Sequence, residues 1–206
     1  MTGLDGMKTA DIILNFLIFG ITAVLLVRFA RKEGQWAPDR VRFAFRFFTC
    51  QSNALCAAAA LLTAAAGLGG SIPRWIWILK YAGTAAVTVT MLTVFLFLWP
   101  SIGKGGLQRL LKGSDLFMHL VTPLLAIFTF CVPEKQGMGF ACSLWGMAPV
   151  LIYGQHYLYR VMYAPEDKRW DDFYGFNKHG KIAVAFTAMI IGIFAVCMAF
   201  MLVQNA

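Results

Sequence analysis

Six apolar blocks, each close to 20 residues long, constrain this chain more than any other feature of its sequence. A helix of about 20 residues crosses roughly 30 Å of hydrocarbon, so each block has the length of a transmembrane span. We therefore predict an all-α integral membrane protein in which residues 1–206 form a single domain, a six-transmembrane-helix bundle with short loops. The predicted spans are Ile12–Ala30, Phe45–Leu68, Trp75–Trp99, Leu116–Val132, Phe140–Tyr159 and Ile182–Val203.

The charged residues, 14% of the chain, are divided unevenly between the two sides of this bundle. Fourteen of the 18 Lys and Arg residues lie in or beside the first, third and fifth connections. Cytoplasmic loops carry an excess of positive charge, so we predict a multi-pass protein of the cell membrane with both termini outside the cytoplasm. The net charge of +8 then orients the protein in the membrane and attracts anionic lipid headgroups. No nucleic-acid partner is expected. The sequence leaves the oligomeric state open.

The five cysteines do not follow the pattern of a metal site, because the sequence has no CxxC motif and no Cys/His spacing typical of zinc ligands. We therefore expect no metal and no cofactor. Cys131 and Cys142 would lie near the outer face on either side of a short connection. A disulfide between them is one alternative, and two buried free thiols are the other.

Polar side chains recur at one depth in three of the predicted helices. Each lies three or four residues deeper in the membrane than a charged residue at the cytoplasmic boundary. This separation is roughly one helical turn, at about 1.5 Å per residue. A polar group at this depth costs free energy unless it has a partner, so we expect the three helices to meet there. The polar residues are Thr49 after Arg46, His119 after Asp115, and His156 before Arg160.

Each of these helices also carries its polar residues on a single face. In the second span, Thr49, Ser52, Asn53 and Cys56 follow the spacing i, i+3, i+4, i+7, which places them in one stripe. The other two faces consist of Asp115, His119 and Thr122, and of Tyr153, His156, Tyr157 and Arg160.

A hydroxyl beside an imidazole in a partly dry site is the minimal arrangement for acyl transfer. We predict that Thr49 is the nucleophile and that His119 takes its proton as general base and later returns it as general acid. Ser52 or Asn53, about one turn along the helix, could donate a hydrogen bond to the oxyanion. The GxSxG and HExxH signatures of the common hydrolases and metalloproteases are absent from the sequence.

Five further residues have predicted supporting roles. His156 and Tyr153 are candidates for positioning a substrate, and Arg46 or Arg160 for binding its carboxylate or headgroup. Asp115 could orient His119, although Ser114-Asp115 is also typical of a helix N-cap.

Two segments resemble a known family. The segment Phe47-Phe48-Thr49-Cys50-Gln51-Ser52-Asn53-Ala54-Leu55 is similar to the T-x-x-S-N string of prokaryotic six-helix relatives of the androgen-induced gene 1 protein. The segment His119-Leu120-Val121-Thr122-Pro123-Leu124 is similar to their H-x-x-x-P segment. Eukaryotic members, including the androgen-dependent regulator of tissue factor pathway inhibitor, are metal-independent intramembrane hydrolases. They cleave fatty acid esters of hydroxy fatty acids with a Thr nucleophile and a His partner.

The resemblance implies those two roles for Thr49 and His119, and a lipid ester as the substrate. The fifth connection, Arg169–Phe176, departs from the Pro- and Tyr-rich ending of the prokaryotic relatives. Substrate access and substrate identity are therefore open.

The predicted site residues also have structural alternatives. Thr49 could bond the carbonyl group four residues earlier, Asn53 could link two helices, and His156 could belong to an aromatic belt at the membrane interface. Lys80, near the outer end of the third span, is expected to extend toward the interface.

Two other classes of function stand beside the lipid-ester hydrolase. One is a small-solute or ion transporter or channel in which the Thr/Asn/His cluster binds the cargo, and the other is a lipid-binding protein without turnover. The polar residues crowd one leaflet, with Thr84 and Thr88 as their continuation beyond Lys80, which disfavours transport. Transfer of the acyl group to a second lipid instead of water is a variant of the hydrolase.

Overall fold

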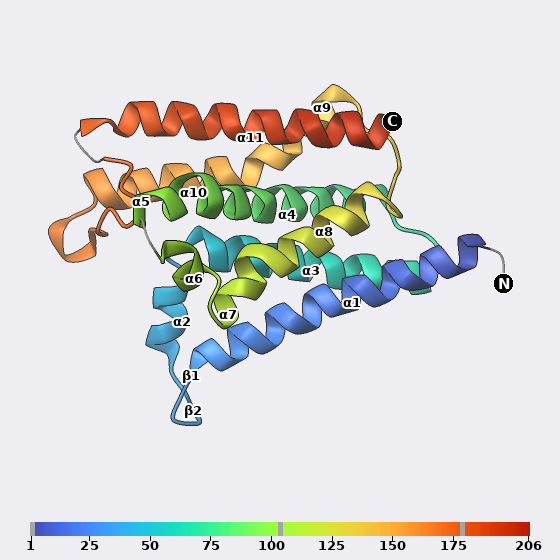
Figure 1. Cartoon of the computed structure of the whole chain (residues 1–206), viewed down its shortest axis with the longest axis horizontal. Helices are drawn as coiled ribbons and strands as arrows, with labels where there is room; N and C mark the ends of the chain where they lie inside the picture. The colour runs from blue at the N-terminus through green and yellow to red at the C-terminus, as the bar shows by residue number, and fades with distance from the viewer. Residues whose placement is uncertain (1–2, 103–104, 178–179) are drawn as a thin grey trace.

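The computed structural model describes residues 3–102, 105–177 and 180–206, and this part of the chain is helical apart from one short hairpin and the connections (Figure 1). Five of its helices are long and apolar enough to cross a membrane, as expected for the predicted all-α membrane protein. They cover Gly6–Ala30, Phe48–Leu68, Arg74–Leu98, Ser114–Cys131 and Ile182–Asn205.

Helix α4 (Arg74–Thr93) occupies the centre of the bundle. It contacts α3 (Phe48–Leu68), α8 (Thr122–Cys131), α10 (Ala148–Leu158) and α11 (Ile182–Asn205), while α1 (Gly3–Ala30) packs against α3 and α8. Small residues bring α3 and α4 close together, because a Cβ on Gly83 would lie 2.8 Å from the Cα of Cys56. Close backbone approach of this kind is how membrane helices gain packing energy, since lipid tails are as apolar as the side chains.

Four buried aromatic rings hold α4, α8 and α11 together. The Phe130 ring centroid lies 5.1 Å from that of Trp77 and 5.6 Å from that of Phe200, and Tyr81 meets Phe200 edge-on at 5.9 Å. Rings at these separations and angles gain energy beyond the area that they bury. This cluster lies in the half of the bundle that contains the two termini.

The fifth predicted span, Phe140–Tyr159, is helical throughout but not a single α-helix. It consists of α9 (Phe140–Ser143), the 3₁₀ turn η3 (Leu144–Met147), α10 and the π turn η4 (Tyr159–Tyr163), and it runs along the bundle beside α11 (Figure 1). Pro149 has no N–H to donate to the Trp145 carbonyl, which accounts for the interruption before α10. Gly146 permits close contact with α4, because a Cβ there would lie 2.6 Å from the Tyr81 hydroxyl oxygen.

A second π turn places His119. Helix α7 (Ser114–Leu116) continues into the π turn η2 (Phe117–Val121) and then into α8, which has Pro123 in its first turn. The N–H of Thr122 donates to the Phe117 carbonyl, five residues back, instead of the usual four. The extra residue in this turn rotates the side chains of α8 about the helix axis relative to those of α7. Such turns occur frequently at functional sites. A third π turn, η1 (Val94–Leu98), extends α4.

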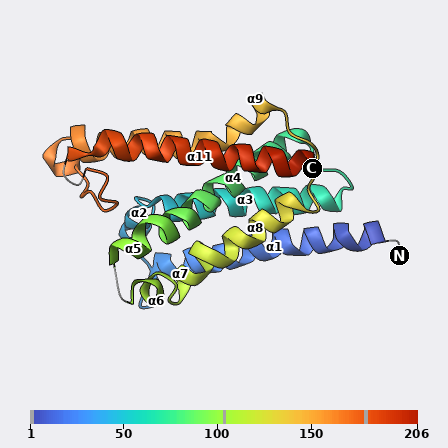
Figure 2. The ribbon, with the colours of Figure 1, turned by 45° about the horizontal axis from the view of Figure 1, so that its top comes forward.

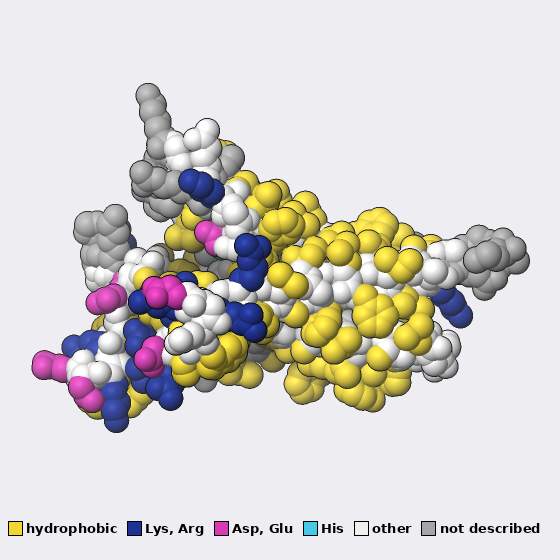
Figure 3. Space-filling view, turned by 90° about the horizontal axis from the view of Figure 1, so that it is seen from below, with side chains coloured by type: hydrophobic (Ala, Val, Ile, Leu, Met, Phe, Trp, Pro, Cys, Tyr) yellow, Lys and Arg dark blue, Asp and Glu magenta, His cyan; other side chains and the backbone are white. Residues whose placement is uncertain are grey.

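Both termini lie at the same end of the bundle (Figures 1 and 2). The opposite end carries the first, third and fifth connections and most of the charge, and Figure 3 shows Lys, Arg, Asp and Glu gathered there while hydrophobic side chains cover the middle. Lys104 and Lys178, which the charge count also assigns to this end, lie outside the described residues. The small elements of this end are β1 (Arg31–Lys32) paired antiparallel with β2 (Gln35–Trp36), α2 (Pro38–Ala44), α5 (Trp99–Ile102), α6 (Gly106–Leu110) and η5 (Glu166–Lys168).

Candidate active site

Thr49 and His119 line one cavity of about 790 Å³ at the charged end of the bundle. Thr49 comes from the first turn of α3 and His119 from η2, so the two sequence segments with the family resemblance meet at this cavity. Arg28 and Arg40 contribute positive charge to the wall, and Asp115 contributes a carboxylate. The cavity is large enough for part of a lipid molecule together with water.

The surroundings of His119 determine which ring nitrogen carries the proton. Its Nδ1 lies 2.9 Å from the carbonyl oxygen of Leu110, and the side chain is 9% exposed. A carbonyl oxygen can only accept, so Nδ1 donates, and in the neutral ring Nε2 is left with its lone pair. The Leu110 carbonyl holds the ring nitrogen for which Asp115 was a candidate partner, and Asp115 is exposed in the wall of the same cavity.

Thr49 is half-buried, and its hydroxyl makes no hydrogen bond to any described residue. The alternative in which it bonds the carbonyl four residues earlier is not what is found, since the Phe45 carbonyl accepts instead from Gln51 Nε2 at 2.7 Å. The backbone N–H of Thr49 likewise has no partner among the described residues. Hydroxyl and N–H therefore stand together in the first turn of α3, where the helix dipole favours negative charge.

Asn53 links the first turn of α3 to the π turn η2. Its Nδ2 donates to the Thr49 carbonyl at 2.9 Å and to the Met118 carbonyl at 3.1 Å. Both amide hydrogens are used, and the bond to Met118 joins α3 to η2, as in the interhelical alternative for Asn53. Because Met118 precedes His119, this bond sets the position of η2 relative to Thr49.

Ser52 faces α4 and not the cavity. It is 1% exposed, and its Oγ lies 2.8 Å from Thr90 Oγ1 and 3.2 Å from the Thr49 carbonyl oxygen. Its single hydrogen serves one of these two acceptors, so Ser52 does not supply an oxyanion donor beside His119.

The four remaining predicted site residues lie outside the described wall of this cavity. Tyr153 donates from its hydroxyl to the Arg46 carbonyl at 2.7 Å, which ties α10 to the segment before α3. His156 is exposed and meets Trp170 edge-on at 5.2 Å, as in its aromatic-belt alternative. The guanidinium groups of Arg46 and Arg160 lie 6.0 and 4.9 Å from Trp170 ring centroids.

The fifth connection folds over the beginning of α3. The hydroxyl of Tyr174 accepts from the Phe48 N–H at 2.9 Å, and burial raises the pKa of Tyr174. Asp172 holds the connection in shape by accepting from the Tyr157 hydroxyl and the Asn177 N–H, both at 2.7 Å. This contact with the site was not predicted from the sequence. The turn-forming residues of Asp172-Phe173-Tyr174-Gly175 indicate that the connection is folded there, but not that it reaches α3.

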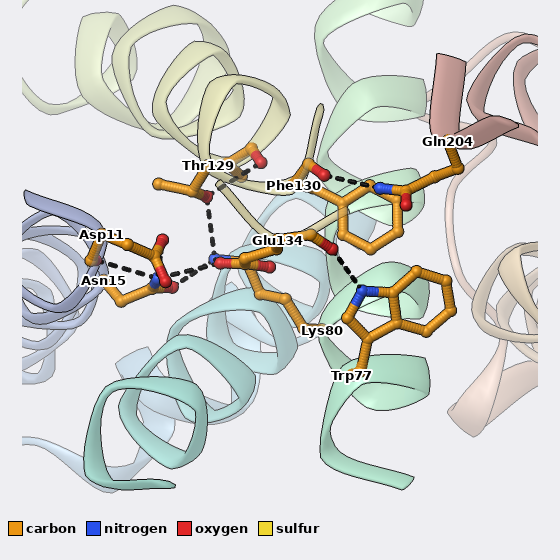
Figure 4. Close-up of polar contacts among 9 residues, drawn as sticks. Asp11, Asn15, Trp77, Lys80, Thr129, Phe130, Glu134 and Gln204 are labelled. Carbon is orange, nitrogen blue, oxygen red and sulfur yellow. Dashed lines mark hydrogen bonds and ion pairs between the residues drawn. The ribbon is translucent and has the colours of Figure 1, made fainter. Parts of the chain in front are cut away.

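A second buried polar cluster lies near the other end of the helices (Figure 4). Lys80 is fully buried, pairs with Glu134 at 3.4 Å, and donates to Asn15 Oδ1 and to Thr129 Oγ1. Asn15 in turn donates to Asp11 Oδ1 and to Glu134 Oε1, each at 2.9 Å. The expectation that Lys80 extends to the interface is wrong, because Glu134, Asn15 and Thr129 hold its ammonium group inside. In the sequence, Asp11 and Asn15 lie four residues apart and therefore on one face of α1, and this spacing was the indication of a buried polar cluster.

The described residues include no group of three or more His, Cys, Asp or Glu arranged to hold a metal ion. All five cysteines lie in this part of the chain and are free thiols, so the Cys131–Cys142 disulfide is not formed. Cys142 Sγ instead accepts from Arg74 Nη2 at 3.6 Å.

Comparison with known proteins finds no matching family model, no matching curated protein and no matching solved structure. The resemblance to the androgen-induced gene 1 family therefore rests on the two segments that meet at the cavity.

Proposed function

We propose that the chain crosses the cell membrane six times, with its termini outside and the Thr49/His119 cavity at the cytoplasmic end. A chain that begins and ends on one side crosses an even number of times, which makes Phe140–Tyr163 the sixth crossing beside the five long helices. The positive charge beside the cavity supports this orientation.

Within this bundle, the proposed function is hydrolysis of a lipid ester, with Thr49 as nucleophile and His119 as general base. One observation carries the proposal. The unbonded hydroxyl of Thr49 and a histidine whose Nδ1 is held by a carbonyl face the same cavity. That arrangement leaves Nε2 to accept a proton, which is the state a general base requires.

The reaction proceeds in two halves. The Thr49 hydroxyl passes its proton to His119 Nε2 and its oxygen attacks the ester carbonyl, while the Thr49 N–H faces the developing oxyanion. His119 then gives the proton to the departing alcohol, and the acyl group remains on Thr49. Water, deprotonated by His119, attacks this acyl-threonine, His119 returns the proton to the departing Thr49 oxygen, and the carboxylic acid is released.

Transport is disfavoured by what lies between the two polar centres. The layer that separates Thr49 and His119 from the Lys80 cluster is a dry apolar cluster of Ile18, Cys56, Ala60, Val87 and Ala126, each fully buried. The buried hydroxyls of Thr84 and Thr122, on the helices of this layer, have no hydrogen-bond partner among the described residues, but two separate hydroxyls do not replace the hydration shell of an ion or polar solute.

Labelling of purified protein by a lipid-like fluorophosphonate, together with hydrolysis of a panel of lipid esters, tests the proposal. We expect wild type to label and to hydrolyse at least one ester, Thr49→Ala and His119→Ala to lose both properties, and Thr49→Ser to keep part of each. Thr63→Ala is the matched control, because Thr63 is buried on the same helix, away from the cavity.

Equal labelling in wild type and Thr49→Ala would remove Thr49 as the nucleophile. A correctly folded wild type that neither labels nor hydrolyses any ester would overturn the hydrolase proposal. Product analysis with an added acceptor alcohol distinguishes hydrolysis from acyl transfer.

A further inference from the structure

Thr49 borders a second cavity as well as the polar one. This small cavity, of about 60 Å³, lies on the α4 and α10 side of Thr49 and is lined mainly by apolar side chains. Thr49 thus stands in a wall between a basic cavity that contains His119 and an apolar cavity that does not.

The small cavity adjoins a larger one between α4 and α11, helices that run side by side (Figures 1 and 2). The larger cavity has a volume of about 330 Å³. The two share part of their walls, namely Val89, Thr93, Leu98, Tyr174, Phe176 and Met189. Its α11 side includes the small residues Ala185, Ala188 and Gly192 beside the larger Met189, Ile193 and Val196. Gly192 is exposed and a Cβ on it would meet no atom within 4 Å, so the cleft is open to the surroundings of the bundle beside this residue.

The chemistry of the proposed reaction decides which part of an ester occupies each side. His119 must protonate the departing alcohol, so the alcohol portion lies in the cavity that contains His119. The acyl portion remains bonded to Thr49 and must extend away from that cavity. The space available there is the apolar one, where each methylene removed from water gains free energy.

We propose that the acyl chain of the substrate runs from Thr49 through the small cavity into the cleft between α4 and α11, and that Gly192 sets the chain length accepted there. This inference rests on the proposed hydrolase function and goes beyond it by naming the acyl pocket and the residue that limits it. Filling the open space at Gly192 shortens the pocket without touching Thr49 or His119.

The test is the rate of hydrolysis of esters of one alcohol with acyl chains of increasing length, in wild type, Gly192→Leu and Gly192→Phe. We expect short chains to react as in wild type and long chains to lose about fourfold in kcat/KM for each excluded methylene, the fold-change equivalent to about 0.8 kcal/mol. Gly20→Leu is the matched control, since Gly20 lies on α1, also has open space, and borders none of the three cavities.

A second readout does not depend on turnover. A fatty acid with a diazirine at its methyl end should label α11 in wild type and in Thr49→Ala, and label it weakly in Gly192→Phe. An unchanged chain-length profile in active Gly192→Leu and Gly192→Phe would overturn the acyl pocket while leaving the hydrolase intact. An inert wild type would instead overturn the hydrolase, and with it this inference.

Discussion

At the scale of single residues, the buried partners of a side chain decide its chemistry. His119 and Asn53 were both recognisable as polar groups inside apolar segments. Which nitrogen of His119 carries the proton depends on Leu110, and the amide of Asn53 is consumed by two carbonyl groups. The Thr49 carbonyl lies four residues before Asn53 on the same helix, but the Leu110 and Met118 carbonyls belong to segments that only the fold brings to His119 and Asn53. The sequence therefore predicts the candidate residues better than their roles.

Lys80 provides a residue-scale prediction. In Lys80→Met, Glu134 and Asp11 lose their buried cation, and an uncompensated buried charge costs about 3–5 kcal/mol. We expect a clearly lower midpoint of thermal unfolding for the detergent-purified variant than for wild type. The double variant Lys80→Met/Glu134→Gln should recover part of the loss, because it removes a charge from the same site.

Lys8→Met, at an exposed lysine near the same end, is the control and should change stability by no more than about 0.5 kcal/mol. If Lys80→Met unfolds at the wild-type temperature, the buried cluster does not contribute to stability as its contacts imply.

At the scale of elements, irregular turns beside prolines place the site. The boundaries of α3 and α11 follow closely from the apolar blocks, because an uninterrupted apolar run has one regular way to satisfy its backbone in a membrane. The π turn η2 and the four-part helix Phe140–Tyr163 do not follow from hydropathy. They depend on how the chain accommodates Pro123 and Pro149 while keeping contact with α4, which is a question of packing.

Pro123→Ala is the prediction for η2. Alanine restores an N–H that can donate to the His119 carbonyl, so the π turn can relax to a regular helix and turn His119 by as much as about 100°, the rotation per residue. We expect stability to be kept or raised, and hydrolysis to fall by roughly 10²-fold, since a misplacement of about 1 Å has that effect. The measurement is kcat/KM beside the unfolding midpoint.

Pro149→Ala makes the same change in another helix that carries none of the catalytic groups. Full activity in Pro123→Ala would show that the π turn does not position His119.

At the scale of the whole molecule, the charge asymmetry and the path of the chain agree. The cationic connections lie at one end and both termini at the other. These two facts are independent, because the first comes from composition and the second from the number of passes. Together they predict the side of the membrane on which the Thr49/His119 cavity opens.

Reporter fusions test this arrangement. We expect reporters fused at the N-terminus and at the C-terminus to indicate the outside of the cell, and a reporter inserted at Glu33-Gly34 in the β1–β2 hairpin to indicate the cytoplasm. Termini on opposite sides would mean an odd number of crossings and would remove Phe140–Tyr163 from the membrane. Both termini in the cytoplasm would invert the orientation and leave the bundle unchanged.

The sequence by itself determined that this protein is an all-α membrane protein, where its long helices begin and end, and that Thr49 and His119 belong together. It could do so because burial of apolar side chains and satisfaction of the backbone act along a single helix and follow its period. Tertiary structure alone decided the tautomer of His119, the structural role of Asn53, the burial of Lys80 and the two cavities that Thr49 borders. Those features arise between helices, where the partner of a polar group is whichever group the packing brings within hydrogen-bond distance.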